Sequence, residues 1–117
     1  MGKKGKYYIN NKEFFNEILT SRVQDKLTDR AVSLILLLAE RRSATKFFYI
    51  HESDRYTCMS QGIEDSIKYW RTFNPEKSEN PFAFFTSVID NGMKKQFNSL
   101  YKLAAKDQVS LSNIYNF

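Results

Sequence analysis

The stretch from residue 81 to 105 constrains the fold most, because it has the pattern of one long amphipathic helix. Asn80 supplies a capping side chain, and Pro81 suits the first position of a helix. Apolar side chains then recur at three- and four-residue steps, at Phe82, Phe85, Ile89, Met93, Phe97, Leu100 and Ala104. Gly and Pro are sparse, with four and two residues, which also disfavours a loop-rich or all-β fold.

Two helices are predicted in the first third of the chain. Asn10, with Glu13 three residues later, marks the start of a helix over about 11–24. Its expected core face consists of Phe14, Phe15, Ile18, Leu19 and Val23. Thr28 caps the second helix, which is apolar almost all round from Ala31 to Ala39 and is closed by Arg41 and Arg42. It should therefore be central and buried.

Residues 43–54 are expected to be irregular, with Phe47, Phe48 and Tyr49 packing that segment. A third helix follows over about 55–72. Its apolar face is Tyr56, Met59, Ile63, Ile67 and Trp70, and its polar face is Gln61, Glu64, Asp65, Lys68 and Arg71. Asn74-Pro75 then interrupts the chain before the long helix.

These segments predict an all-α protein: one compact domain of four main helices over 10–105, with a basic N-terminal arm at 1–9 and a flexible tail at 106–117. The formal charge of +5 favours a polyanionic partner. The single cysteine, Cys58, excludes an internal disulfide and fits a reducing compartment. No secretory signal follows the basic N-terminus, and no apolar run is long enough to span a membrane.

The second face of the long helix is polar and cationic. It contains Phe84, Ser87, Asn91, Lys94, Lys95, Asn98 and Lys102, which lie within about 100° of one another on a helical wheel. Cations along a helix neutralise phosphates, Asn pairs with base edges, and an exposed ring holds an unstacked base. The pattern predicts a surface that grips a nucleic-acid strand. The alternative is an ordinary solvated face, with Phe84 buried against the 43–54 segment.

The run Gln61-Gly62-Ile63-Glu64-Asp65-Ser66-Ile67-Lys68, then Phe73-Asn74, then Asn80-Pro81-Phe82-Ala83-Phe84-Phe85-Thr86, resembles region 2 of bacterial sigma factors. Among these it is most similar to the late-transcription sigma factors of T-even-type tailed bacteriophages, which share the early Tyr-x-x-Asn-Asn-Lys-Glu seen here at 7–13. The resemblance covers about 7–100 and is densest in 61–86.

The resemblance implies a non-enzymatic initiation factor that works in the cytoplasm of an infected bacterial cell. Gln61, Glu64, Asp65 and Lys68 would bind the coiled coil in the largest subunit of the host core RNA polymerase. Phe84 would capture the flipped adenine of a TATA-like −10 promoter element, with Asn91, Lys94 and Lys95 on the DNA. Primary sigma factors carry two adjacent Trp residues where this chain has Ser87 and Val88. We expect no room in this chain for a domain that recognises the −35 element.

The tail Ser110-Leu111-Ser112-Asn113-Ile114-Tyr115 resembles the clamp-binding motif of the phage late sigma factors. Leu111, Ile114 and Tyr115 would enter a hydrophobic pocket on the phage DNA sliding clamp, and the resemblance leaves room for a late co-activator. The alternative is that these residues cap the core of their own domain.

Other functions have less support in the sequence. His51 and Cys58 are the only soft metal ligands and fall short of a zinc site, so we expect a surface His, a core Cys, and neither metal nor cofactor. Asp54, Glu64 and Asp65 lack a nucleophile or base partner, so catalysis is not expected. Two functional alternatives stay open: a polymerase-binding adaptor or inhibitor that does not melt DNA, and a generic helical DNA-binding module.

Overall fold

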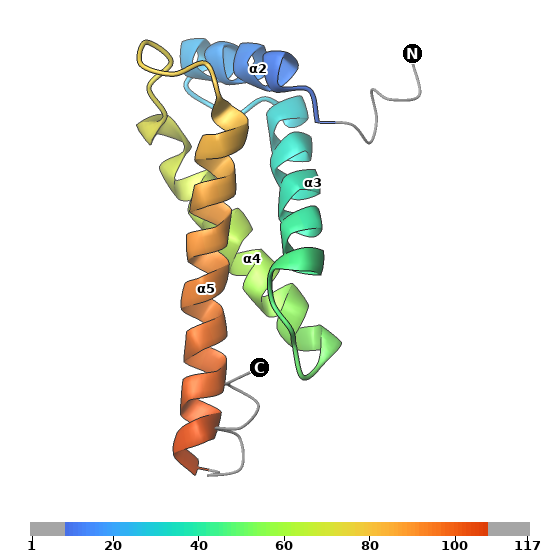
Figure 1. Ribbon diagram of the computed structural model, residues 1–117. Coiled ribbons are helices and arrows are strands. Elements are labelled where there is room, and N and C mark those ends of the chain that lie inside the picture. Colours follow the sequence, from blue (N-terminus) through green and yellow to red (C-terminus); the bar gives the residue numbers. More distant parts are fainter. Residues whose placement is uncertain (1–8, 108–117) are drawn as a thin grey trace.

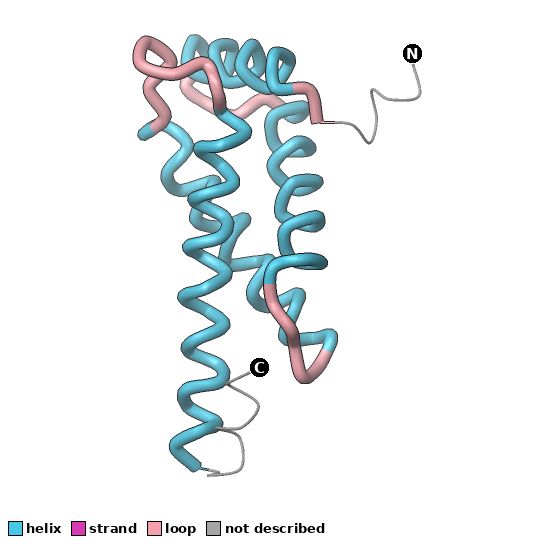
Figure 2. The backbone as a smooth tube through the Cα atoms, in the orientation of Figure 1, coloured by secondary structure: helices cyan, strands magenta, loops and turns pink. Residues whose placement is uncertain are grey.

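The computed structural model describes residues 9–107, and within that range all regular structure is helical, which confirms the all-α prediction. The elements are α2 (Asn11–Gln24), α3 (Asp29–Lys46), α4 (Glu52–Tyr69), the 3-10 turn η1 (Trp70–Thr72) and α5 (Pro81–Asp107). In Figure 1, α3 and α5 descend side by side, α4 returns in the opposite direction across them, and α2 lies over one end. Figure 2 shows how short the connections are.

The predicted caps begin three of the helices. The Asn10 side chain accepts hydrogen bonds from the backbone N–H groups of Lys12 (2.9 Å) and Glu13 (3.1 Å), and α2 spans the expected 11–24. Thr28 Oγ1 accepts from the Ala31 N–H at 3.0 Å. Asn80 Oδ1 accepts from the Ala83 N–H at 3.0 Å, with Pro81 as the first helical residue.

The end of α3 differs from the prediction. The helix does not close at Arg41 and Arg42 but continues to Lys46, and α4 begins at Glu52, so only 47–51 lies between helices. Tertiary contacts stabilise the extra turn. Arg42 forms a two-point ion pair with Asp90 of α5, at 2.9 and 2.7 Å.

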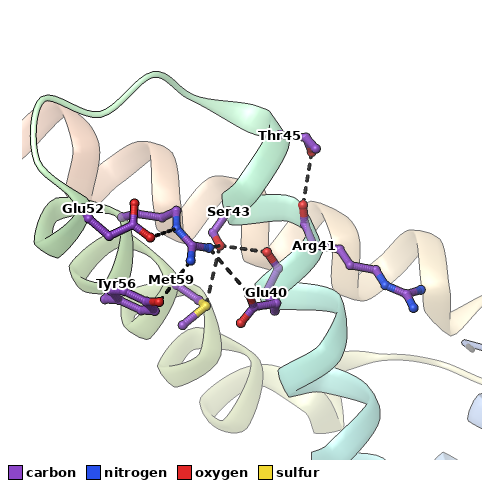
Figure 3. Close-up of polar contacts among 8 residues, drawn as sticks. Glu40, Arg41, Ser43, Thr45, Glu52, Tyr56 and Met59 are labelled. Carbon is purple, nitrogen blue, oxygen red and sulfur yellow. Dashed lines mark hydrogen bonds and ion pairs between the residues drawn. The ribbon is translucent and has the colours of Figure 1, made fainter. Parts of the chain in front are cut away.

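An arginine of α4 joins the same turn to the start of α4. The guanidinium of Arg55, whose side chain is 13% exposed, donates to Ser43 Oγ at 2.8 Å and to Glu52 Oε2 at 2.9 Å. Figure 3 shows Ser43 and Met59 facing each other across this junction. Arg55 and Asp90, which hold this turn, lie on α4 and α5 rather than on α3. Local sequence therefore gave no signal for the longer helix.

The core lies where α2, α3 and α5 meet, and its largest fully buried side chains include Phe14, Ile18, Leu34, Ile35, Leu38, Phe85, Ile89 and Met93. Several predictions about it were wrong: Phe82, on the predicted apolar stripe of α5, is 39% exposed, and Leu36, in the helix that was expected to be buried, is 44% exposed. Leu19 and Val23 of α2 are 37% and 89% exposed, because α2 covers one end of the bundle and only its Phe14–Ile18 edge meets the core. Ile9, assigned to the N-terminal arm, is buried.

The buried face of α4 also differs from the predicted one. Small and polar residues are buried there (Cys58, Gly62, Asp65 and Ser66), whereas Tyr56 and Ile67 are 47% and 42% exposed. The cause is a close crossing of α4 and α5. A Cβ atom added to Gly92 would lie 2.7 Å from Asp65 Oδ2 and 3.1 Å from the Gln61 carbonyl oxygen. This contact excludes large side chains, so the apolar stripe of α4 lies partly on the surface.

Candidate nucleic-acid interface

Phe84 lies in the first turns of α5, where the chain has just left the 73–80 loop. Its ring is half-buried, with centroids 5.4 Å from Phe73 and 5.0 Å from Phe85. The expectation of an unburied ring is therefore only partly right. The alternative, burial against 43–54, is wrong, because the ring packs on Phe73 after α4. One part of the ring is fixed by aromatic contacts and another remains at the surface.

A surface pocket of about 280 Å³ opens beside this ring. The second half of α4 and the turn after it form one side, and α5 forms the other. Its lining residues are Asp65, Tyr69, Thr72, Phe84, Val88 and Asn91. The volume lies just under the roughly 300–1,000 Å³ of ordinary small-molecule sites. Aromatic and aliphatic walls offer stacking, and the hydroxyl, amide and carboxylate groups offer hydrogen bonds at the edges.

The cationic face continues along α5 from this pocket. Ser87, Asn91, Lys94, Lys95 and Lys102 are exposed, and Asn98 is half-buried. Phe84 and Asn91 share the pocket, whereas the lysines lie further along the helix. Lys95 also extends sideways, with its Nζ 3.4 Å from Asp65 Oδ2. The predicted residues thus occupy one helix face, but only two of them line the pocket.

Asp65 has a different environment from the one predicted. It is buried in the α4–α5 seam, where its carboxylate accepts from Gln61 Nε2 at 2.9 Å and faces Lys95. Gln61 is itself half-buried, and only Glu64 and Lys68 of the predicted polymerase-binding set are exposed. The predicted docking set therefore divides in two: Asp65 and Gln61 organise the seam beside the pocket, and Glu64 and Lys68 remain on the surface.

Tyr69 and Thr72 were missed as site residues. Tyr69 is 45% exposed and lines the pocket from the α4 side. A weak signal was present, because Tyr69 follows Asp65 by four residues and therefore lies on the same helix face. Thr72 belongs to η1, whose tighter winding does not follow the α-helical period, so its position could not be obtained from a helical wheel.

The remaining candidates carry no site in the part of the chain that is described. His51 is exposed and Cys58 is fully buried, as expected, and burial raises the pKa of the Cys58 thiol to about 11. No group of three potential metal ligands occurs within residues 9–107, and no helix there is long and apolar enough to cross a membrane. Leu111, Ile114 and Tyr115 lie outside the described residues. Comparison of the chain with protein-family models and with curated protein sequences gave no match.

Proposed function

We propose that this protein is a promoter-recognition factor of the sigma region 2 type, which binds host core RNA polymerase and opens a TATA-like −10 element. One observation supports the proposal above all. The pocket that Phe84 and Tyr69 line lies near the start of α5, and exposed lysines follow it along one face of that helix. The amino-acid sequence of residues 61–86 resembles sigma region 2, and this resemblance supports the same function.

On the DNA side, the two parts of α5 have different tasks. Lys94, Lys95 and Lys102 neutralise phosphates and release counterions, which gives affinity with little dependence on sequence. Phe84 stacks on a base that leaves the duplex, an interaction worth about 1–3 kcal/mol. Asn91, at the same pocket, donates or accepts a hydrogen bond at the base edge. Capture of the extruded base stabilises the melted state over the duplex.

On the polymerase side, the docking surface is the exposed part of α4. Glu64 and Lys68 offer charges, and the 42% exposed Ile67 between them offers apolar area. We leave Asp65 out of this surface because it is buried against α5. A mixed surface of this kind suits the helical coiled coil of the largest polymerase subunit, the partner that the resemblance implies.

The C-terminal residues Leu111, Ile114 and Tyr115 are proposed to bind the phage DNA sliding clamp during late transcription in the infected cell. A tether of this kind raises the effective concentration of the factor at DNA without new promoter contacts. A late co-activator remains compatible with this arrangement. Truncation after Lys106 should then abolish stimulation by the clamp and leave basal initiation unchanged.

The decisive experiment is run-off transcription with core polymerase on an AT-rich −10 promoter, with and without the clamp. Phe84→Leu should abolish promoter opening and leave polymerase binding intact. Phe82→Leu is a matched control, because Phe82 is 39% exposed on the same helix but does not line the pocket. Equal activity of both variants would contradict base capture by Phe84.

Two other outcomes would replace the proposal. Polymerase binding by the wild-type protein without any transcript would indicate an adaptor or inhibitor. Tight promoter binding by the isolated protein at physiological salt, with no need for polymerase, would indicate a generic DNA-binding module.

A further inference from the structure

We propose that Tyr69 is a second nucleobase-stacking residue, so that the pocket holds one unpaired DNA base between rings contributed by two helices. The inference rests on the proposed function of the pocket as a base site. Phe84 comes from α5, and Tyr69, the last residue of α4, lines the same pocket from the other helix.

The chain leaves the Tyr69 ring at the surface although its neighbour is buried. Trp70 is only 3% exposed, whereas Tyr69 is 45% exposed and is absent from the hydrophobic core. Consecutive residues of a helix point about 100° apart, so Trp70 can face the core while Tyr69 faces the surface. Core packing therefore does not account for the Tyr69 ring.

The charges around Tyr69 fit a nucleotide rather than an apolar ligand. Lys68 Nζ lies 5.3 Å from the centroid of the Tyr69 ring, so the ring has a cation beside it that raises the local positive potential. Asp65 lies on the same α4 side of the pocket as Tyr69, and its carboxylate is balanced by Lys95 of α5, whose Nζ lies 3.4 Å from Asp65 Oδ2. Hydrogen-bonding groups line the pocket, namely the side chains of Asp65, Thr72 and Asn91. A bound base could pair its edge donors and acceptors with them.

Tyr56 provides a matched control on the same helix. Its exposure of 47% is close to the 45% of Tyr69, and it also lies beside a cation, with Arg55 Cζ 4.6 Å from its ring centroid. It does not line the pocket. Exposure, residue type and a neighbouring cation are therefore shared, and the position at the pocket is the difference that the two variants test.

The test measures binding of a short single-stranded −10 oligonucleotide, carrying 2-aminopurine at the captured position, to the protein in complex with saturating core polymerase. Tyr69→Leu should weaken binding by about fivefold to 150-fold and reduce the quenching of 2-aminopurine, as expected for the loss of one stacked ring. Tyr69→Phe and Tyr69→Trp should retain both signals, and Tyr56→Leu should match the wild type.

Three results separate the possible failures. Wild-type binding together with unchanged binding by Tyr69→Leu would overturn the role of Tyr69, even if Phe84→Leu abolishes binding. Equal losses in Tyr56→Leu and Tyr69→Leu would also overturn it, because the effect would then not depend on the pocket. No oligonucleotide binding by the wild-type complex would overturn the proposed function itself. Thermal melts of each variant establish that it is folded.

Discussion

The two ends of α5 both carry clusters of aromatic rings, but they use them differently. Near the start of the helix, Phe85 stacks on Phe14 at 5.1 Å, and Phe84 extends that cluster to the pocket. Further along, Phe97 lies 4.7 Å from Phe47 and 4.5 Å from Tyr101. The first cluster opens to solvent at a site, and the second is closed over by a loop.

Hydrogen bonds account for the closure of the second cluster. Tyr101 donates its hydroxyl to Asp54 Oδ2 at 2.8 Å and accepts from the Ile50 N–H at 2.9 Å, which fixes the 47–51 loop on α5. The expectation that Phe47 and Tyr49 pack this segment is confirmed, whereas Phe48 is 77% exposed. The comparison shows that aromatic content alone does not distinguish a core cluster from a candidate binding site. The two kinds of cluster are distinguished by hydrogen bonds that hold a loop over the rings.

The largest expected effect comes from removing the central ring of the closed cluster. Phe97→Ala should lower the free energy of unfolding by about 3–5 kcal/mol, because the ring packs on Phe47, Tyr49 and Tyr101 and is 9% exposed. Phe84→Ala should lower it by less, since part of that ring is already in water. Urea titrations of both variants measure the difference. Equal losses would show that the open cluster is as tightly packed as the closed one.

An intermediate loss of folding stability is expected when the Tyr101 hydroxyl, which joins the 47–51 loop to α5, is removed. Tyr101→Phe leaves the Ile50 N–H and the Asp54 carboxylate without this partner and should cost about 1–3 kcal/mol of folding stability. Tyr56→Phe serves as the control, because it removes a hydroxyl whose hydrogen bond, accepted from Arg55 at 3.2 Å, is exposed to solvent and should contribute little. Hydrogen exchange of the Ile50 amide should accelerate in Tyr101→Phe only. An unchanged rate would mean that the loop is fixed by ring packing alone.

A further effect should appear only at alkaline pH. Burial raises the pKa of Tyr49 and of Tyr101 to about 12 and that of Cys58 to about 11. Each folded-state pKa exceeds the ordinary value, so the folded chain holds protons that the unfolded chain has released. Stability should therefore be constant up to about pH 9, near the ordinary cysteine pKa of 9.0, and fall progressively toward pH 12. Chemical denaturation at pH 7, 9, 10 and 11 checks this, and a rise in stability over that interval would contradict it.

The sequence predicted those parts of the fold that depend on local chemistry. Asn10, Thr28 and Asn80 cap helices through their own side chains, so their positions could be inferred from residue type and spacing. The end of α3 could not be inferred, because an arginine one helix away and Asp90 of α5 hold its last turn. Hydrophobic periodicity also failed on α4, because Gly62 of α4 and Gly92 of α5 bring the two helix backbones together and small residues form the buried face.

The candidate site also has one part that could be predicted from the sequence and one part that could not. The cationic face of α5 follows from a single helix, so a helical wheel was sufficient to predict it. The pocket requires α4 and α5 to cross, and that crossing brings Tyr69 and Thr72 to Phe84. Asp65 was assigned to the surface because it falls on the polar face of the predicted helix, and its ion-pair partner Lys95, on α5, is recognisable only in three dimensions.

The smallest expected change in folding stability comes from removing the Tyr49 hydroxyl, which makes no hydrogen bond in the closed cluster as the structure describes it. Among the described residues, Tyr49 has a buried hydroxyl with no hydrogen-bond partner, although its ring packs on Phe47 and Phe97. Tyr49→Phe keeps the ring and removes the unsatisfied group, so it should raise the free energy of unfolding by at most about 1 kcal/mol. It should also reduce the alkaline decline, because one of the three buried acids is removed. A loss of stability in Tyr49→Phe, measured beside Tyr101→Phe, would show that the Tyr49 hydroxyl has a partner in solution. The two tyrosines would then close the cluster together rather than Tyr101 alone.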